Sequence, residues 1–358
     1  MRRRAFLGAA TAGAAATGLA WTPSMARAST TWNMVTSWPR DFPGPGRTAQ
    51  RLANRITAMS DGELKVKLFA AGELVPAFEV FDAVAGGVAE MGHSAAFFWR
   101  GKARATVFFT TVPFGLTASE MSAWIYYGGG QELWDELYGG FGLKAFMAGN
   151  TGMQMGGWFK REIHSLDDFK GLRYRMPGLG GEVLRRLGAM AVNLPPGEIL
   201  PALQSGAIDG AEFLGPWSDL AFGFYKVTPY YYWPGFHEPN GTSECLVDRR
   251  AYGRLPKHLQ AIVAAACAAE NDVALAESEW GNATALQTLV SEHGVELRKF
   301  PSDVLQAMRV TTEDVLSEFS HGDDLTKRIF TSFKAARRKL VDWSRVSHHA
   351  FLDARLKT

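Results

Sequence analysis

The sequence predicts an α/β fold of two lobes, with parallel or mixed sheets, a long helix that spans both lobes and a helical C-terminal tail. Strand-like segments alternate with helical ones through residue 248, which favours sheets covered by helices on both faces. A chain of 358 residues is too long for one ordinary hydrophobic core, so we expect two lobes. Between residues 256 and 293 a helical pattern continues without a break, which predicts the long helix.

The individual elements follow from their residue patterns. Short apolar or alternating runs predict strands at 31–38, 61–69, 89–95, 143–150, 172–176, 190–194, 243–248 and 295–300. Helical spacing predicts helices at 47–60, 76–87, 119–137, 181–187, 196–206 and 256–293, followed by two or three more near the end. In sheets of this kind ligands bind beyond the carboxyl ends of the strands, so the loops after the strands are the candidate sites.

These elements divide the chain into a leader, two lobes, a helix and a tail. The expected parts are residues 1–28 as leader, 29–149 with 239–255 as lobe I, 150–238 as lobe II, 256–293 as the long helix, and 294–358 as a strand with C-terminal helices.

The leader has the composition of an export signal. Arginines at 2–4 precede an Ala/Gly/Leu run, and Ala26-Arg27-Ala28 matches a small-x-small cleavage site. The residues Arg3-Arg4-x-Phe6-Leu7 resemble the twin-arginine export motif, and an ordinary secretory signal is the alternative. Without residues 1–28 the formal net charge changes from +2 to −2, so no basic surplus remains to indicate nucleic-acid binding. No later stretch has the length and apolarity expected of a membrane helix.

Arg175 is the sharpest candidate for binding an anion. It ends a short predicted strand in the stretch "DDFKGLRYRMPGLGG", residues 167–181, where a sheet presents side chains to a cleft. A guanidinium holds a carboxylate through parallel hydrogen bonds and stays charged at any working pH. A structural ion pair with Asp167 or Asp168, or a solvated strand edge, is the alternative. We expect Arg173 to be solvated or paired.

The glycines after Pro177 do not make a nucleotide loop. The third glycine of the G-x-G-x-x-G spacing is replaced by Val183, and no acidic residue ends a strand about twenty residues later. The glycines are better explained by a tight turn at the start of a helix, whose N-terminus favours an anion.

Polar residues follow other predicted strands. Glu212 lies in an otherwise apolar run, where a carboxylate is costly unless it meets a cation or donors. His237 and Glu238 lie between aromatic residues and a proline, and a solvated turn is the default interpretation of this pair. Asn150 and Gln154 follow the strand at 143–150. Gln154, Glu212 and Glu238 together would form an oxygen-only site, which suits Na⁺ or Ca²⁺ and does not suit Zn²⁺.

Enzyme motifs and a cysteine metal framework are absent from the sequence. It contains no Gly-x-Ser-x-Gly, no His-Glu-x-x-His and no phosphate loop of the Walker type. The two cysteines, Cys245 and Cys267, are compatible with one disulfide in an oxidising compartment or with two buried free thiols.

Three ordered segments carry a resemblance to a known family. The segments "SLDDFKGLRYRMPG", "LPPGEILPALQSGAIDGAEF" and "YYYWPGFHEPNG" resemble the solute-binding subunits of TRAP transporters, the tripartite ATP-independent periplasmic carriers. The similarity extends from "TSWP" through the long helix, and it is nearest to the branch that binds 2-oxo or 2-hydroxy monocarboxylates with a metal ion. The resemblance implies a periplasmic-binding-protein-like fold that closes on its ligand by hinge motion.

The resemblance also assigns roles to individual residues. It makes Arg175 the carboxylate clamp, with Asn150, Phe98 and Trp38 lining the pocket. It assigns a Na⁺ or Ca²⁺ ion that bridges protein and ligand to Gln154, Glu212, the carbonyl of Phe213 and Glu238. Phe213 replaces the tryptophan usual in this branch; the carbonyl survives that change, and the pocket loses an indole.

The sequence therefore predicts a periplasmic binding protein, without catalytic activity, that captures a small organic acid anion for TRAP membrane subunits. The resemblance also allows a homodimer through the C-terminal helix. The alternative is an exported oxidoreductase with a cofactor, since twin-arginine export carries folded proteins.

Overall fold

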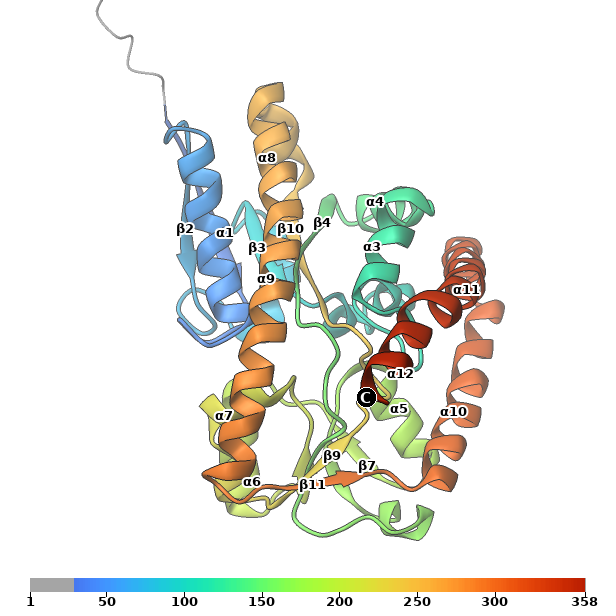
Figure 1. The fold of residues 1–358 in the computed structure, drawn as a ribbon. Coiled ribbons are helices and arrows are strands. Elements are labelled where there is room, and N and C mark those ends of the chain that lie inside the picture. The colour runs from blue at the N-terminus through green and yellow to red at the C-terminus, as the bar shows by residue number, and fades with distance from the viewer. Residues whose placement is uncertain (1–28, 358) are drawn as a thin grey trace, which may run out of the picture.

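The computed structural model describes residues 29–357 and has an α/β architecture built on two mixed sheets (Figure 1). The expected leader, residues 1–28, lies outside the described residues. Each sheet and its covering helices form one lobe, and the α/β fold class predicted from the sequence is confirmed.

The first lobe contains a five-stranded sheet in the order β2-β1-β3-β10-β4. β1 is parallel to β2 and β3, whereas β10 is antiparallel to both β3 and β4. The strands are β1 (Thr30–Thr36), β2 (Leu64–Phe69), β3 (Met91–Ser94), β4 (Leu143–Asn150) and β10 (Thr242–Asp248).

The second lobe contains a six-stranded sheet in the order β11-β9-β5-β8-β6-β7. β5 is antiparallel to β8 and β9, and the other pairs are parallel. The strands are β5 (Gly157–Phe159), β6 (Arg173–Arg175), β7 (Met190–Val192), β8 (Gly210–Ala211), β9 (Tyr230–Trp233) and β11 (Glu296–Lys299). Three of them, β5, β8 and β9, were not predicted from the sequence.

The helices cover both sheets and extend to the C-terminal end. They are α1 (Pro45–Met59), α2 (Val80–Ala85), α3 (Ala118–Tyr127), α4 (Gly130–Gly139), α5 (Gly178–Arg186), α6 (Pro196–Ser205), α7 (Pro216–Phe222), α8 (Arg249–Arg254), α9 (Lys257–Ser291), α10 (Ser302–Ser317), α11 (Asp324–Ser344) and α12 (Ala350–Leu356). The single helix predicted at 119–137 is wrong: Gly128 and Gly129 separate α3 from α4, and Gly129 has a φ of 82° that glycine adopts readily.

The chain passes between the two sheets three times, twice through loop segments and once through α8 and α9, which lead from β10 to β11. It leaves the first sheet after β4 and returns to it through the segment between β9 and β10. The 35-residue helix α9 runs along both lobes (Figure 1) and packs against β4, α1 and α7. Contrary to the expectation from the sequence, its length and hydropathy would suit a membrane span. It buries Glu270 against Arg51 and Arg55 of α1, as expected for a helix inside a protein.

Cys245 on β10 and Cys267 on α9 are buried free thiols in the structure. Of the two possibilities that the sequence left open, the structure therefore has the unbridged one.

Candidate functional site

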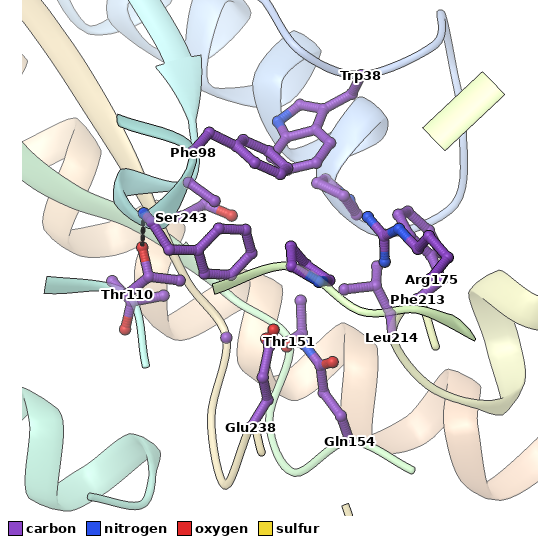
Figure 2. A pocket seen from close by; sticks show the side chains of 16 residues that line it. Trp38, Phe98, Thr110, Thr151, Gln154, Arg175, Phe213, Leu214, Glu238 and Ser243 are labelled. Atoms are coloured by element: carbon purple, nitrogen blue, oxygen red, sulfur yellow. Dashed lines mark hydrogen bonds between the residues drawn. The ribbon is translucent and has the colours of Figure 1, made fainter. Parts of the chain in front are cut away.

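A small cavity lies between the two lobes (Figure 2). Its volume is about 30 Å³, measured as the space open to the centre of a water-sized sphere. It is lined by Trp38, Pro45, Ala95, Phe97, Phe98, Thr110, Thr151, Gln154, Arg175, Pro177, Phe213, Leu214, Glu238, Gly241, Thr242 and Ser243. The first lobe contributes aromatic residues and the hydroxyl residues Thr110, Thr242 and Ser243. The second lobe contributes Arg175, and the two crossing segments contribute Gln154 and Glu238.

Arg175 ends β6 and is 1% exposed, so its charge must be compensated inside the protein. Its Nη1 donates hydrogen bonds to the Glu212 carbonyl at 2.5 Å and to Glu212 Oε2 at 3.3 Å, and Nε donates to the Leu194 carbonyl at 3.3 Å. Burial lowers the pKa of Arg175, and Glu212 and Glu238 oppose that shift. Nη2 has no hydrogen-bond partner among residues 29–357, and it is the donor left for a ligand.

Glu212 follows the two-residue strand β8, and its side chain is fully buried. One carboxylate oxygen faces Arg175, while Oε1 lies 3.4 Å from His237 Nε2 without the alignment of a hydrogen bond. His237 itself is 1% exposed, so the expectation of a solvated turn at 237–238 is wrong. The turn is buried because it lies in the segment that crosses from β9 to β10 between the lobes.

Glu238 and Gln154 bring the two crossing segments together. Burial raises the pKa of Glu238 well above its ordinary value, and the neighbouring Glu212 raises it further. Gln154 donates from Nε2 to Thr151 Oγ1 at 2.9 Å. Gly241 makes room for this approach, since a Cβ there would lie 2.5 Å from Gln154 Nε2 and 3.2 Å from Glu238 Oε2.

The residues fit a hard cation. Ligand atoms of Glu212, His237 and Glu238 lie within 4.8 Å of one another, and all three residues are buried. Gln154 Oε1 and Glu212 Oε1 are buried acceptors without a hydrogen-bond partner in the part of the chain that the structure describes. Buried acceptors without donors are costly unless another positive group reaches them. Carboxylate and amide oxygens are the ligands that Na⁺ and Ca²⁺ prefer.

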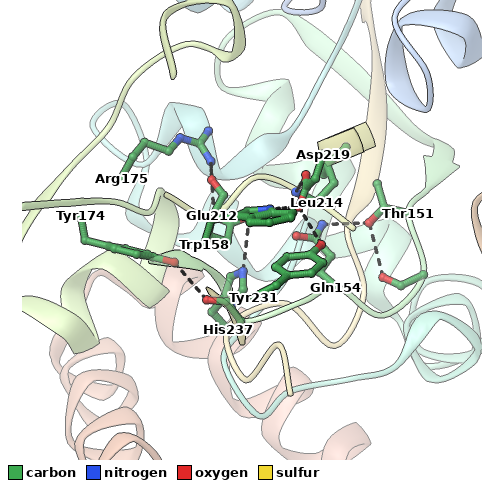
Figure 3. A network of polar contacts seen from close by, with 12 residues as sticks. Thr151, Gln154, Trp158, Tyr174, Arg175, Glu212, Leu214, Asp219, Tyr231 and His237 are labelled. Atoms are coloured by element: carbon green, nitrogen blue, oxygen red, sulfur yellow. Dashed lines mark hydrogen bonds and ion pairs between the residues drawn. The ribbon is translucent and has the colours of Figure 1, made fainter. Parts of the chain in front are cut away.

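A second layer of polar contacts supports the loop that carries Glu212 (Figure 3). Asp219 of α7 is buried and accepts hydrogen bonds from Trp158 Nε1 at 2.9 Å, Tyr231 Oη at 2.7 Å and the Leu214 amide at 3.4 Å. Burial raises the pKa of Asp219 to about 7. The two side-chain donors are aromatic residues of the second sheet, and the third donor is the Leu214 amide, so Asp219 fixes the loop from Glu212 to Leu214 to that sheet.

The aromatic residues that line the cavity, called the aromatic wall here, come from both lobes. Trp38 and Phe98 contact each other in the first lobe, with ring centroids 6.1 Å apart. Phe213 contacts Phe42 at 5.9 Å and Phe222 at 5.0 Å, and the Arg175 guanidinium lies 5.7 Å from its ring. Phe213 is therefore packed between aromatic rings and the guanidinium of Arg175.

Of the site residues predicted from the sequence, Arg175, Gln154, Glu238, Phe98, Trp38 and Phe213 line one cavity, and Glu212 lies directly behind Arg175. Asn150 is not among the lining residues. Its amide donates to Asn240 and Thr242, and its Oδ1 accepts from the Gly152 amide. Asn150 therefore shapes the crossing segment, and its polar atoms are occupied by protein.

The two arginines of β6 have different environments. Arg173 is exposed and makes a two-point ion pair with Asp209. The sequence had predicted that Arg173 is either solvated or paired, and the structure has the paired arrangement. Arg175 pairs with Glu212 and not with Asp167 or Asp168, which lie in a surface turn. The glycines after Pro177 form the first turn of α5, where Gly178 has a φ of 62°.

Sequence reasoning missed several polar residues of the cavity. Thr110, Thr151, Thr242 and Ser243 line it, but isolated hydroxyl residues carry no recognisable spacing. Asp219 was missed as well, although a lone acid among "LGPWSDLAF" offered the same signal of an acid in an apolar run as Glu212 did.

The chain is similar to known proteins over most of its length. The family model "Bacterial extracellular solute-binding protein, family 7" (DctP) matches residues 34–322. A monocarboxylate 2-oxoacid-binding periplasmic protein of a Nostoc species is 41% identical over 320 residues, which cover 89% of this chain and 87% of the relative.

Two solved structures are similar throughout. A TRAP periplasmic solute-binding protein from Pseudoalteromonas atlantica, with bound sodium and pyruvate, has a TM-score of 0.88 and 40% identity, covering 91% of this chain and 99% of the other. A TRAP transporter solute-binding protein from Bordetella bronchiseptica has a TM-score of 0.90 and 36% identity, covering 92% and 98%. It is described as a dimer of mixed occupancy, with calcium and picolinate in one site and the other site empty.

Proteins of this family bind small organic acids in the periplasm and work with TRAP membrane subunits; they are not enzymes. The findings thus support a binding protein and do not support the oxidoreductase alternative. With a buried arginine facing a small interlobe cavity, and with a family match over most of its length, this chain belongs to the family 7 (DctP) extracellular solute-binding proteins of TRAP transporters.

Proposed function

We propose that this protein binds a small 2-oxo monocarboxylate such as pyruvate, together with a metal ion, and delivers the acid to a TRAP membrane carrier. The observation that carries the proposal is Arg175, a buried arginine whose Nη2 has no partner among the described residues, beside two buried acids and the free Gln154 Oε1. The ligands of the relatives, pyruvate and picolinate, are small monocarboxylates and support the same class.

In this proposal the groups have separate roles. Arg175 Nη2 donates to the ligand carboxylate, and Glu212, Glu238, Gln154 Oε1 and the Phe213 carbonyl hold the ion. The ion would supply positive charge that offsets the charge of the two acids and of the ligand carboxylate. Trp38 and Phe98 cover the apolar end of the ligand. Asn150 contributes by holding the start of the crossing segment.

The charges of the site favour a divalent ion. Arg175, Glu212 and Glu238 together carry a net charge of −1 when both acids are ionised. A monocarboxylate adds a further negative charge, and a divalent cation cancels the sum. Sodium would leave one uncompensated negative charge in a buried site, which is costly unless a carboxyl group is protonated. We therefore infer Ca²⁺ as the preferred ion.

The size of the cavity favours pyruvate over longer acids and over dicarboxylates. A second carboxylate would face Glu238 or the aromatic wall and would lack a second cationic residue among those lining the cavity. Titration calorimetry with pyruvate, a branched 2-oxo acid and succinate tests this expectation, after chelation in sodium-free buffer and again with added calcium. Pyruvate binding that persists at full affinity without either ion would refute the bridging-ion proposal.

We also propose the finer features that the sequence indicates. Export follows the twin-arginine route, which is tested by replacing Arg3 and Arg4 with lysine and measuring periplasmic accumulation.

The first lobe comprises residues 29–149 with 239–255, and the second lobe comprises residues 150–238. Limited proteolysis at the crossing segments tests these limits. A homodimer forms through the C-terminal helices, consistent with the exposed Trp343 and Phe351 and with the dimeric relative; sedimentation of the full chain and of a chain ending at residue 344 tests it.

A further inference from the structure

We propose that His93 is a positioning residue for the ligand cavity, which fixes the indole of Trp38 in the cavity wall through two hydrogen bonds in series. His93 does not line the cavity. The inference rests on the proposed function for what the cavity binds, whereas the two bonds do not depend on the identity of the ligand.

The series of contacts links three strands of the first lobe. Trp38 follows β1, is 4% exposed and lines the cavity. Its Nε1 donates a hydrogen bond to His93 Nδ1 at 2.8 Å. His93 lies on β3 with no exposed surface, and its Nε2 is 3.1 Å from the carbonyl oxygen of Ala148 on β4.

The partners determine the tautomer of His93. An indole N–H only donates and a carbonyl oxygen only accepts, so Nδ1 must be the unprotonated nitrogen and Nε2 must carry the hydrogen. Burial lowers the pKa of His93 to about 4, which keeps the ring neutral as this arrangement requires. One neutral histidine therefore satisfies a donor and an acceptor that would otherwise both be buried without partners.

The Ala148 carbonyl is available because β4 is irregular at this residue. Met147 pairs with Glu244 and Gly149 pairs with Ser243 of β10, so Ala148 has no register partner. A β-bulge leaves one residue outside the ladder in this way. β4 then ends at Asn150, where the crossing segment with Gln154 begins. His93 thus ties the aromatic wall of the first lobe to the strand end that leads into the ion-binding segment.

Without this bond the indole has few other polar restraints. Its ring neighbour on the cavity side is Phe98, in a tilted contact at 6.1 Å. In a cavity of about 30 Å³, a rotated indole would change the space left for a ligand by a large fraction. We therefore expect a loss of the Trp38–His93 bond to weaken ligand binding although neither bonded atom touches the ligand.

Two isosteric substitutions separate the two bonds. His93→Gln places an amide donor near the position of Nε2, so it keeps the bond to Ala148 and loses the acceptor for Trp38. His93→Asn places a carbonyl acceptor near Nδ1, so it keeps Trp38 and loses Ala148. Each variant leaves one buried polar group unpaired, and we expect similar losses in melting temperature.

The affinities should differ between the variants. By titration calorimetry with pyruvate and calcium, we expect about tenfold weaker binding for His93→Gln and at most about threefold for His93→Asn, from the loss of one buried hydrogen bond in each. In a Trp38→Phe background, His93→Gln should cause no further loss. Equal affinities for the two variants, or weaker binding by His93→Asn, would overturn the inference.

A second readout does not require the ligand. The indole N–H resonance of Trp38, identified by its absence in Trp38→Phe, should be protected from exchange in the wild type and in His93→Asn. It should shift and exchange faster in His93→Gln. If the wild-type protein takes up no pyruvate, the proposed function fails and the resonance still decides on the positioning role. An unchanged resonance in His93→Gln would overturn that role.

Discussion

Replacement of Arg175 should separate ligand binding from folding when it is compared with its neighbour Arg173. Arg175 is the one cationic residue among those lining the cavity, and its Nη2 is the donor available to a carboxylate. A hydrogen bond to a charged group contributes about 1.5–3 kcal/mol, which corresponds to about 10- to 150-fold in affinity. The acids Glu212 and Glu238 would then repel the ligand without a fixed cation, so we expect a loss of at least about 100-fold for Arg175→Ala.

The same replacement should also affect stability. The guanidinium of Arg175 is the partner of the buried Glu212. Removal of one partner of a buried ion pair costs about 3–5 kcal/mol of unfolding free energy. Arg175→Lys keeps a positive charge for Glu212 and loses the planar fork, so it should remain folded while binding pyruvate more weakly.

The control and the assay follow from the same strand. Arg173→Ala removes an exposed ion pair, which contributes at most about 1 kcal/mol, and it should bind pyruvate within about twofold of the wild type. Calorimetric titrations at a temperature where all four proteins are folded by circular dichroism give the affinities. If Arg175→Ala binds pyruvate within about threefold of the wild type, Arg175 is not the carboxylate clamp.

Three further predictions concern the rest of the molecule. Gly241→Ala should reduce pyruvate and calcium binding at least about tenfold, because its Cβ would lie 2.3 Å from Thr151 Oγ1 and 2.5 Å from Gln154 Nε2. The control Gly253→Ala places its Cβ in open space and should bind pyruvate and calcium normally. Cys245 and Cys267 should be inert to a thiol reagent in the native protein, and both should react in denaturant. Reduction should not change the melting temperature, and a denatured chain that does not react would indicate a disulfide. Burial raises the pKa of Glu244 to about 8 from an ordinary 4.5, so the folded state holds a proton that the unfolded state has lost, and stability should fall as pH rises between these values. Glu244→Gln should remove about 2 kcal/mol of the fall between pH 6 and 8 in urea unfolding of the ligand-free protein, and an identical pH dependence in both proteins would contradict the assignment.

Much of the first lobe could be predicted because its strands are long enough to show a pattern. β1, β2 and β4 have six to eight residues each, and the sequence placed all three within three residues at each end. The strands of the second lobe were harder to predict, because β5 and β8 have only three and two residues. Such short segments are strands only because they pair with neighbouring strands. No periodicity exists in two residues, so the sheet that positions Glu212 was not visible in the sequence.

The candidate site divides in a similar way. Arg175, Glu212, Glu238 and Gln154 were predicted because charged or amide residues in apolar surroundings, and a family resemblance, both point to them. The burial of His237 and the role of Asn150 could not be predicted, because they depend on how the two crossing segments fold against each other. The same is true of His93, whose partners Trp38 and Ala148 are each 55 residues away in the sequence.

The distribution of the site over the lobes has a consequence for the order of binding. Arg175 and Glu212 belong to the second sheet, and Gln154 and Glu238 lie on the crossing segments, so in the hinge motion expected from the sequence the proposed ion ligands and the clamp would stay together. Trp38 and Phe98 belong to the first lobe and line the cavity in this structure, so the hinge motion expected from the sequence would withdraw them from it. An ion can therefore load in the open state, where it neutralises the two acids, and the acid anion then binds to a site that no longer repels it.

Closure adds the aromatic wall of the first lobe last, so a replacement of Trp38 should accelerate pyruvate release more than it slows uptake. A replacement of Glu238 should instead weaken ion binding first. Stopped-flow titration of pyruvate into calcium-loaded and into chelated protein tests this order. Pyruvate binding by the chelated protein, before any ion is added, would indicate the reverse order.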